Sequence, residues 1–140
     1  MSFGTIDHVG VAVFDLEKAL KVYSDDFGYQ EVCRERLEDY GVEVVFLGRG
    51  GDFSGGFPLI EILAPFGENS KLYSFLKRRG EGLHHIAYLV TDIEAELERL
   101  RAGGHKLVDL SPRLGAREML VAFIHPSSAN GVLVELCQKR

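Results

Sequence analysis

The sequence predicts an α+β fold that is built from two tandem βαβββ modules. His8 and His85 each open an apolar, strand-like run, and they stand 77 positions apart (85 − 8). Further pairs share this offset: Val13 with Val90, Asp15 with Asp92, Glu17 with Glu94, Leu20 with Leu97, and Phe46 with Phe123. Glu61 in LIEIL and Glu135 in LVELC form another matched pair, 74 positions apart (135 − 61). Duplicated units of this length bury a shared face by stacking, so we expect the two histidines and two glutamates to converge across a pseudo-twofold axis.

The first module begins with an alternating strand and a capped helix. In residues 6–13 one face carries valines, which we expect to meet the helix, and the opposite face carries His8. Asp15 is predicted to be the N-cap of a helix that runs to about Phe27 and stops at Gly28. Three extended stretches follow it, at about 30–37, 42–49 and 57–64.

The second module repeats this order after a linking helix. The capping-box pattern Thr91-Asp92-Ile93-Glu94 predicts a helix that runs to Gly103-Gly104. The strands expected after it lie at about 105–110, 118–125 and 131–137. We expect residues 1–140 to form a single domain, which consists of module one (about 5–64), the linking helix (about 68–79) and module two (about 82–138).

Composition excludes several classes of protein. A net charge of −5 argues against a general nucleic-acid binder, because phosphate affinity needs a concentrated basic surface. No apolar run approaches the roughly 20 residues that span a bilayer, so we expect no membrane partner. The first residues lack a secretory pattern, and Cys33 and Cys137 are too few for a disulfide framework. We therefore expect a cytoplasmic protein with reduced thiols.

The matched histidines and glutamates are the candidates for chemistry. Glu61 and Glu135 stand within apolar strands, where burying a carboxylate costs several kcal/mol unless it is paired or bound to a cation. Small neighbours leave space beside His8 and His85 on the face opposite the helix. Imidazole and carboxylate ligands together suit Zn, Ni or Co. One histidine or glutamate alone is more often structural, but four at matched positions predict a His2Glu2 metal site.

The other three histidines carry weaker signals. His84 precedes His85 in the strand and should face the opposite side of the sheet. His105 follows a glycine pair and is expected to be exposed to solvent. His125 precedes a proline at a strand end, where it either lines the site or shapes the turn.

Three segments resemble the methylmalonyl-CoA epimerase family: IDHVGVAVFDLEKAL, KRRGEGLHHIAYLVTDI and IHPSSANGVLVEL. This family belongs to the vicinal oxygen chelate superfamily, which also contains glyoxalases, bleomycin resistance proteins and dioxygenases. The resemblance covers nearly the whole chain and implies paired modules that form a curved mixed sheet around a divalent metal. It does not decide whether that metal is Co, Ni, Zn or Mn. It also implies a homodimer. The family's metal ligands fall on His8, Glu61, His85 and Glu135.

The resemblance implies a reaction that suits this site. The substrate would be an acyl-CoA whose C2 proton leaves to form an enolate, and Glu135 and Glu61 would act as bases on its two faces. Glu135 is the firmer of these assignments. Some epimerases carry another carboxylate at the position of Val44, and the adjacent Glu43 should face the other way. The cations that could meet the CoA phosphates are Lys71, Lys77, Arg78, Arg79, Arg113 and Arg117.

Three other functions fit this fold. Glyoxalase I shares the His2Glu2 ligands, so ligand identity alone does not separate it from an epimerase. Antibiotic-binding proteins of the superfamily lack these ligands, which counts against that alternative. A ring-cleaving dioxygenase more typically presents two histidines and one carboxylate, so the additional glutamate makes it a poorer match.

Overall fold

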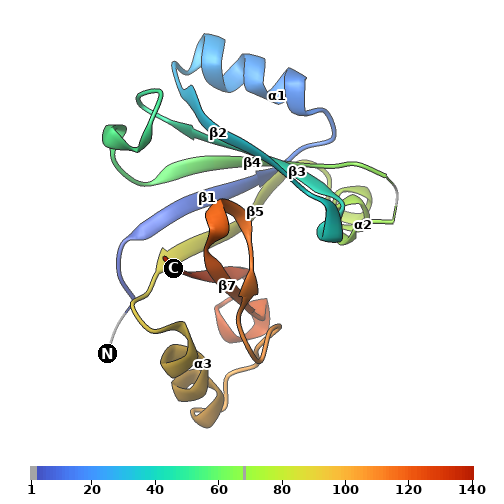
Figure 1. Ribbon diagram of the computed structural model, residues 1–140. Helices are drawn as coiled ribbons and strands as arrows, with labels where there is room; N and C mark the ends of the chain where they lie inside the picture. Colours follow the sequence, from blue (N-terminus) through green and yellow to red (C-terminus); the bar gives the residue numbers. More distant parts are fainter. Residues whose placement is uncertain (1–2, 68) are drawn as a thin grey trace. The chain divides into compact units, whose positions relative to one another are not determined.

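The computed structural model describes residues 3–67 and 69–140 and confirms the predicted α+β, glyoxalase-like architecture (Figure 1). The chain divides into two compact units by its internal contacts. The N-terminal unit is His8–His84, and the C-terminal unit combines the segment that ends at Asp7 with His85–Arg140. Each unit carries one copy of the repeat. The expectation of a single domain over residues 1–140 stays a prediction.

The N-terminal unit contains a mixed sheet with the strand order β2-β3-β4-β1. Its strands are β1 (Ile6–Ala12), β2 (Gln30–Leu37), β3 (Val42–Gly48) and β4 (Leu59–Pro65). Its helices are α1 (Leu16–Lys21), the π-helical turn η1 (Val22–Asp26), the 3-10 turns η2 (Glu38–Tyr40) and η3 (Phe53–Gly55), and α2 (Lys71–Arg79). β1 runs parallel to β4, and the other neighbours are antiparallel. In Figure 1, α1 lies along one face of this sheet.

The C-terminal unit repeats this topology with the strand order β5-β8-β7-β6. Its elements are β5 (Gly82–Leu89), α3 (Ile93–Ala102), β6 (Arg113–Leu114), η4 (Ala116–Glu118), β7 (Leu120–Ile124), η5 (Pro126–Ser128) and β8 (Val134–Gln138). β5 runs parallel to β8, as β1 does to β4, and the other neighbours are antiparallel. Each unit therefore has the predicted βαβββ order, with its first and last strands side by side.

The predicted strand at 105–110 is wrong. Leu107 forms only an isolated bridge to Ile124, and the strand that pairs with β7 is the two-residue β6. The Asp109 side chain explains the difference, because its Oδ2 accepts the Phe123 N–H at 2.8 Å. The Phe123 carbonyl meanwhile accepts from the backbone N–H groups of both Val108 and Asp109. The Asp109 carboxylate thus accepts the N–H that a backbone carbonyl would accept in a regular antiparallel pair. The strand therefore does not continue.

Helix boundaries follow the matched aspartates. Asp15 accepts a hydrogen bond from the backbone of Lys18, and Asp92 accepts one from the backbone of Ala95, each over 3.1 Å. The cap of α3 is therefore Asp92 rather than Thr91, with which the capping-box pattern began. The helix predicted over 15–27 is present, with its last turn widened into the π-helical η1.

The linking helix begins later than predicted. Ser70 caps α2 through the backbone N–H of Tyr73, and Gly80 ends the helix with a φ of 80°. Leu72 and Leu76 are buried. Residue 68, where the predicted helix begins, lies outside the described residues. Within the described residues, no helix is long and apolar enough to cross a membrane.

The buried cores of the two units correspond at most of their positions. In the N-terminal unit the buried cluster consists of Val13, Leu16, Leu20, Val45, Leu47, Ile62 and Ala64. In the C-terminal unit it consists of Val90, Ile93, Leu97, Leu100, Ala122, Ile124, Val134 and Leu136. Both clusters lie between the helix and one face of the sheet, which confirms that the valine face of β1 meets α1. Because side chains alternate along a strand, His8 and His85 point to the face away from the helix.

Candidate metal centre

The parallel pairing of β1 and β4 brings His8 and Glu61 together. Gly10 is the Cα partner of Glu61 in this register, so the two strands present a histidine and a glutamate on the same face. His8 Nε2 lies 3.3 Å from Glu61 Oε1, and both side chains are almost completely buried. We call His8 and Glu61 the first pair.

The C-terminal unit repeats this arrangement. Ala87, which corresponds to Gly10 in the repeat, is the Cα partner of Glu135 on the parallel strand β8. His85 Nε2 lies 3.2 Å from Glu135 Oε1, and both residues are buried. We call His85 and Glu135 the second pair. The two units thus build matched histidine–carboxylate pairs from matched strands.

An aromatic ring stands beside each pair, and sequence reasoning missed its role. Phe46 meets the His8 ring edge to face, with centroids 5.2 Å apart and an interplanar angle of 88°. Phe123 meets the His85 ring in the same way, at 5.7 Å and 90°. One signal for this role was present in the sequence, because Phe46 and Phe123 share the offset of the histidines.

The separations within the pairs fit two ligands of one metal ion. Ligand atoms held about 2.0–2.2 Å from a metal lie about 2.8–3.6 Å apart in octahedral to tetrahedral geometry. The observed separations of 3.3 and 3.2 Å fall within this range. Imidazole and carboxylate donors also suit Zn, Co and Ni, so the chemistry of the donor set agrees with the geometry.

The three remaining histidines lie outside these pairs. His84 is partly exposed and packs against the ring of Phe75, with centroids 4.7 Å apart. His105 is exposed, as predicted. His125 shapes the turn, because its Nδ1 accepts the backbone N–H of Ser127 at 3.0 Å and lies 2.8 Å from that residue's hydroxyl.

Two of the arginines named as cations that could meet the CoA phosphates have protein partners. Arg117 is not a surface cation, since its side chain is 11% exposed and its Nη1 lies 2.6 Å from Asp7 Oδ2. Arg113 is 35% exposed, donates from Nε to Asp109, and lies over the ring of Phe123. Sequence reasoning missed Asp7, because its counterpart in the repeat is His84. The position therefore lacks the matched carboxylate that drew attention to Glu61 and Glu135.

Val44 and Glu43 behave as the strand alternation predicts. Val44 is fully buried and lies on the same face of β3 as Phe46. Glu43 is partly exposed and points to the other face. The position where some epimerases carry a further carboxylate is therefore apolar in this chain.

The fold and these pairs agree with a known superfamily. A family model described as the Glyoxalase/Bleomycin resistance protein/Dioxygenase superfamily matches residues 7–123. The chain belongs to this superfamily.

Several relatives within the superfamily are similar over nearly their whole length. The chain is 39% identical to an ethylmalonyl-CoA/methylmalonyl-CoA epimerase of Cereibacter sphaeroides, over 96% of this chain and 98% of that protein. It is 36% identical to the uncharacterized protein YqjC of Bacillus subtilis, over 96% of this chain and 92% of that protein. The crystal structure of methylmalonyl-CoA epimerase from Mycobacterium tuberculosis matches with a TM-score of 0.88 and 35% identity, over 100% of this chain and 93% of that one.

Proposed function

We propose that this protein is a metal-dependent epimerase that interconverts (R)- and (S)-methylmalonyl-CoA by removing and returning the proton at C2. The observation that carries the proposal is the pair of matched, buried His–Glu contacts at 3.3 and 3.2 Å. The similarity to epimerases of 2-substituted malonyl-CoA thioesters supports the choice of substrate. A homodimer and a cytoplasmic location remain predictions.

The proposed metal ligands are His8, Glu61, His85 and Glu135, two from each unit. A bound divalent cation such as Co, Ni, Zn or Mn would act there as a Lewis acid for a substrate oxygen. The four side chains contribute two carboxylates, which would neutralise the charge of a divalent cation. Burial of both pairs excludes bulk water, which strengthens electrostatic interactions within the site.

The two glutamates are the proposed proton carriers. Inversion at C2 requires that a proton leaves from one face of the carbon and returns on the other. Glu135 is proposed to take the proton from one epimer, and Glu61 to supply it on the opposite face. Val44 carries no carboxylate, so the proposed second base is Glu61, which is the counterpart of Glu135 in the repeat. Gly10 and Ala87, the Cα partners of these glutamates, add little bulk beside them.

Proton exchange in D2O tests this function. Metal-reconstituted protein is incubated with methylmalonyl-CoA and followed by NMR, with the methylglyoxal–glutathione adduct in a parallel assay. We expect metal-dependent deuterium incorporation at C2, interconversion of the epimers and no lactoylglutathione. Turnover of the adduct alone would identify a glyoxalase I instead, which needs the same ligands. Activity on neither compound would favour a small-molecule-binding protein or another substrate, and would overturn the proposal.

A further inference from the structure

We propose that Phe46 and Phe123 are positioning residues that fix the imidazole orientation of the two candidate metal-binding histidines, and that Arg113 and Asp109 hold Phe123 in place. This inference rests on the proposed metal centre, because it assigns a role around the same side chains. It assigns these residues no contact with the substrate.

The orientation of an imidazole on a strand is weakly determined by the side chain itself. The χ2 torsion of histidine is broad, so the plane of the ring can turn over a wide range. In each pair, Nε2 is the atom that faces the carboxylate. Something besides the covalent geometry must hold the ring in the plane in which Nε2 reaches the carboxylate.

A perpendicular phenylalanine ring restricts the plane of each imidazole. Phe46 and Phe123 are the Cα partners of Glu61 and Glu135 on the antiparallel neighbouring strands. Each ring reaches past the central glutamate strand to the histidine of the next strand, with interplanar angles of 88° and 90°. A contact of this kind favours one ring orientation by about two- to tenfold. The same device at both matched positions indicates one function rather than incidental packing.

In the C-terminal unit the phenylalanine is itself held. The Arg113 guanidinium carbon lies 5.6 Å from the centroid of the Phe123 ring, within the range of a cation–π contact. Asp109 accepts both the Arg113 Nε–H and the Phe123 backbone N–H, at 3.3 and 2.8 Å. A chain of contacts therefore runs from Asp109 through Arg113 and Phe123 to His85.

Two variants test the chain of contacts, and a third serves as a control. Phe123→Leu removes the ring, and Arg113→Met removes the cation from a partly exposed position without opening the core. Ile124→Ala is the matched control, since Ile124 is the next residue of β7 and packs in the cluster beneath α3. The histidine ring nitrogens are observed by long-range 1H–15N NMR in metal-free, 15N-labelled protein, and Co2+ affinity is measured by visible absorption without any acyl-CoA.

We expect one sharp set of His85 ring resonances in the wild type and in Ile124→Ala. Phe123→Leu should broaden or duplicate this set and weaken Co2+ binding by about two- to tenfold, which is the preference that the lost ring contact supplied. Arg113→Met should produce a smaller effect in the same direction. Wild-type ring resonances and Co2+ affinity in both variants would overturn the inference. Loss of ring order in Ile124→Ala as well would also overturn it, because the effect would then be general loosening.

The experiment separates this inference from the proposed function. If wild-type protein binds no Co2+, the proposed metal centre fails, and the metal-free NMR still decides whether Phe123 orients His85. If Co2+ binds with equal affinity in the wild type and in both variants, the metal centre stands and the positioning role fails.

Discussion

Arg117 donates a hydrogen bond of 2.6 Å from Nη1 to Oδ2 of Asp7, whose carboxylate is fully buried. The arginine reaches this position from a left-handed backbone conformation, with φ 59° and ψ 25°. A residue with a Cβ is less stable there by about 1–2 kcal/mol. The loop before β7 therefore combines an unfavourable backbone conformation at Arg117 with the ion pair that Arg117 forms.

Replacing Arg117 should reveal two contributions to the free energy of unfolding. The ion pair stabilises the fold, and the positive φ at this residue destabilises it. Arg117→Ala leaves a buried carboxylate without its guanidinium and should lower the free energy of unfolding by about 3–5 kcal/mol. Arg117→Gly loses the same pair but tolerates the positive φ, so it should be more stable than the alanine variant by about 1 kcal/mol. Urea unfolding measures both values. An alanine variant at least as stable as the glycine variant would contradict this interpretation of the backbone.

The matched helix caps make a second prediction. Asp15→Ala and Asp92→Ala should each lower the free energy of unfolding by about 1 kcal/mol, because each side chain accepts a backbone N–H of the first helical turn. Thr91→Ala should cost much less, since Asp92 rather than Thr91 is the N-cap. Thermal unfolding monitored by circular dichroism measures all three. Equal losses in the Thr91 and Asp92 variants would show that the capping box begins at Thr91.

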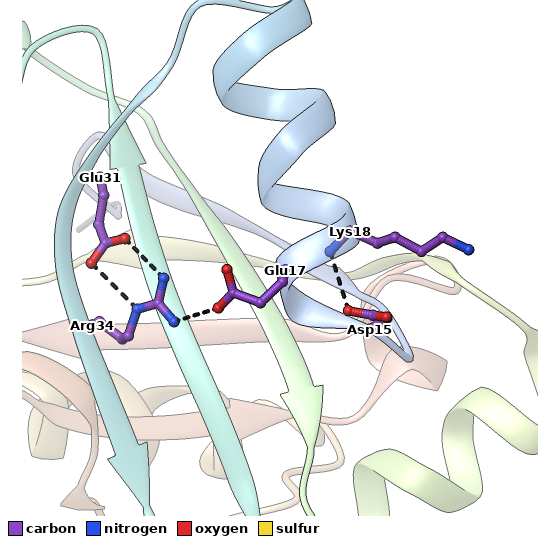
Figure 2. Close-up of polar contacts among 5 residues, drawn as sticks. All are labelled: Asp15, Glu17, Lys18, Glu31 and Arg34. Carbon is purple, nitrogen blue, oxygen red and sulfur yellow. Dashed lines mark hydrogen bonds and ion pairs between the residues drawn. The ribbon is translucent and has the colours of Figure 1, made fainter.

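Arg34 connects strand β2 to helix α1 on the surface of the N-terminal unit (Figure 2). It donates to Glu31 on its own strand and to Glu17 on the helix, at 3.0 and 2.9 Å. The hydrogen bond that Arg34 donates to Glu31, followed by the one that it donates to Glu17, raises the pKa of Arg34 above its ordinary value. The guanidinium therefore stays charged throughout the pH range in which the protein is handled.

Arg34→Met should cost only about 0.5–1 kcal/mol of unfolding free energy, because the network is exposed to solvent. The loss should shrink in 1 M salt, where charges are screened. Lys18→Met is the matched control, since Figure 2 shows the Lys18 side chain pointing away from this network. Chemical unfolding at low and high salt provides the comparison. A loss that is independent of salt would mean that Arg34 acts through packing.

The proposed proton carriers predict different behaviour for the two epimers. Glu135→Gln and Glu61→Gln each keep a side-chain oxygen but remove a base, so each should block epimerisation. Each should still allow deuterium exchange at C2 of the one epimer whose proton faces the remaining glutamate. Metal content is measured on both variants so that loss of the ion is not mistaken for loss of the base. Unchanged exchange and epimerisation in Glu61→Gln would show that Glu61 is not a base.

The repeat made much of the fold predictable from sequence. One offset related His8 to His85 and Asp15 to Asp92, and the structure places both histidines on parallel-paired strands and both aspartates at helix caps. Short-range patterns were sufficient there, because strand alternation and capping depend on neighbouring residues.

Features that occur in only one of the two repeats were not predictable from the sequence. Asp109 interrupts the expected strand at 105–110 through a contact with Phe123, 14 positions away. Asp7 and Arg117 are 110 positions apart, and neither has a matched counterpart of its own kind. A left-handed arginine also leaves no signature in sequence, because glycine is the residue that normally marks that conformation.

Metal stoichiometry in the wild type and in two single variants tests the proposal that His8, Glu61, His85 and Glu135 hold one metal ion. Co2+ is titrated into the metal-free wild type, His8→Ala and His85→Ala, with His125→Ala as a control because His125 only shapes a turn. We expect one high-affinity ion per chain in the wild type and in the control, and severely weakened binding in both other variants. Two ions per chain in the wild type, with His8→Ala and His85→Ala each losing only one, would show that each unit binds metal independently. That result would contradict the proposed single metal centre.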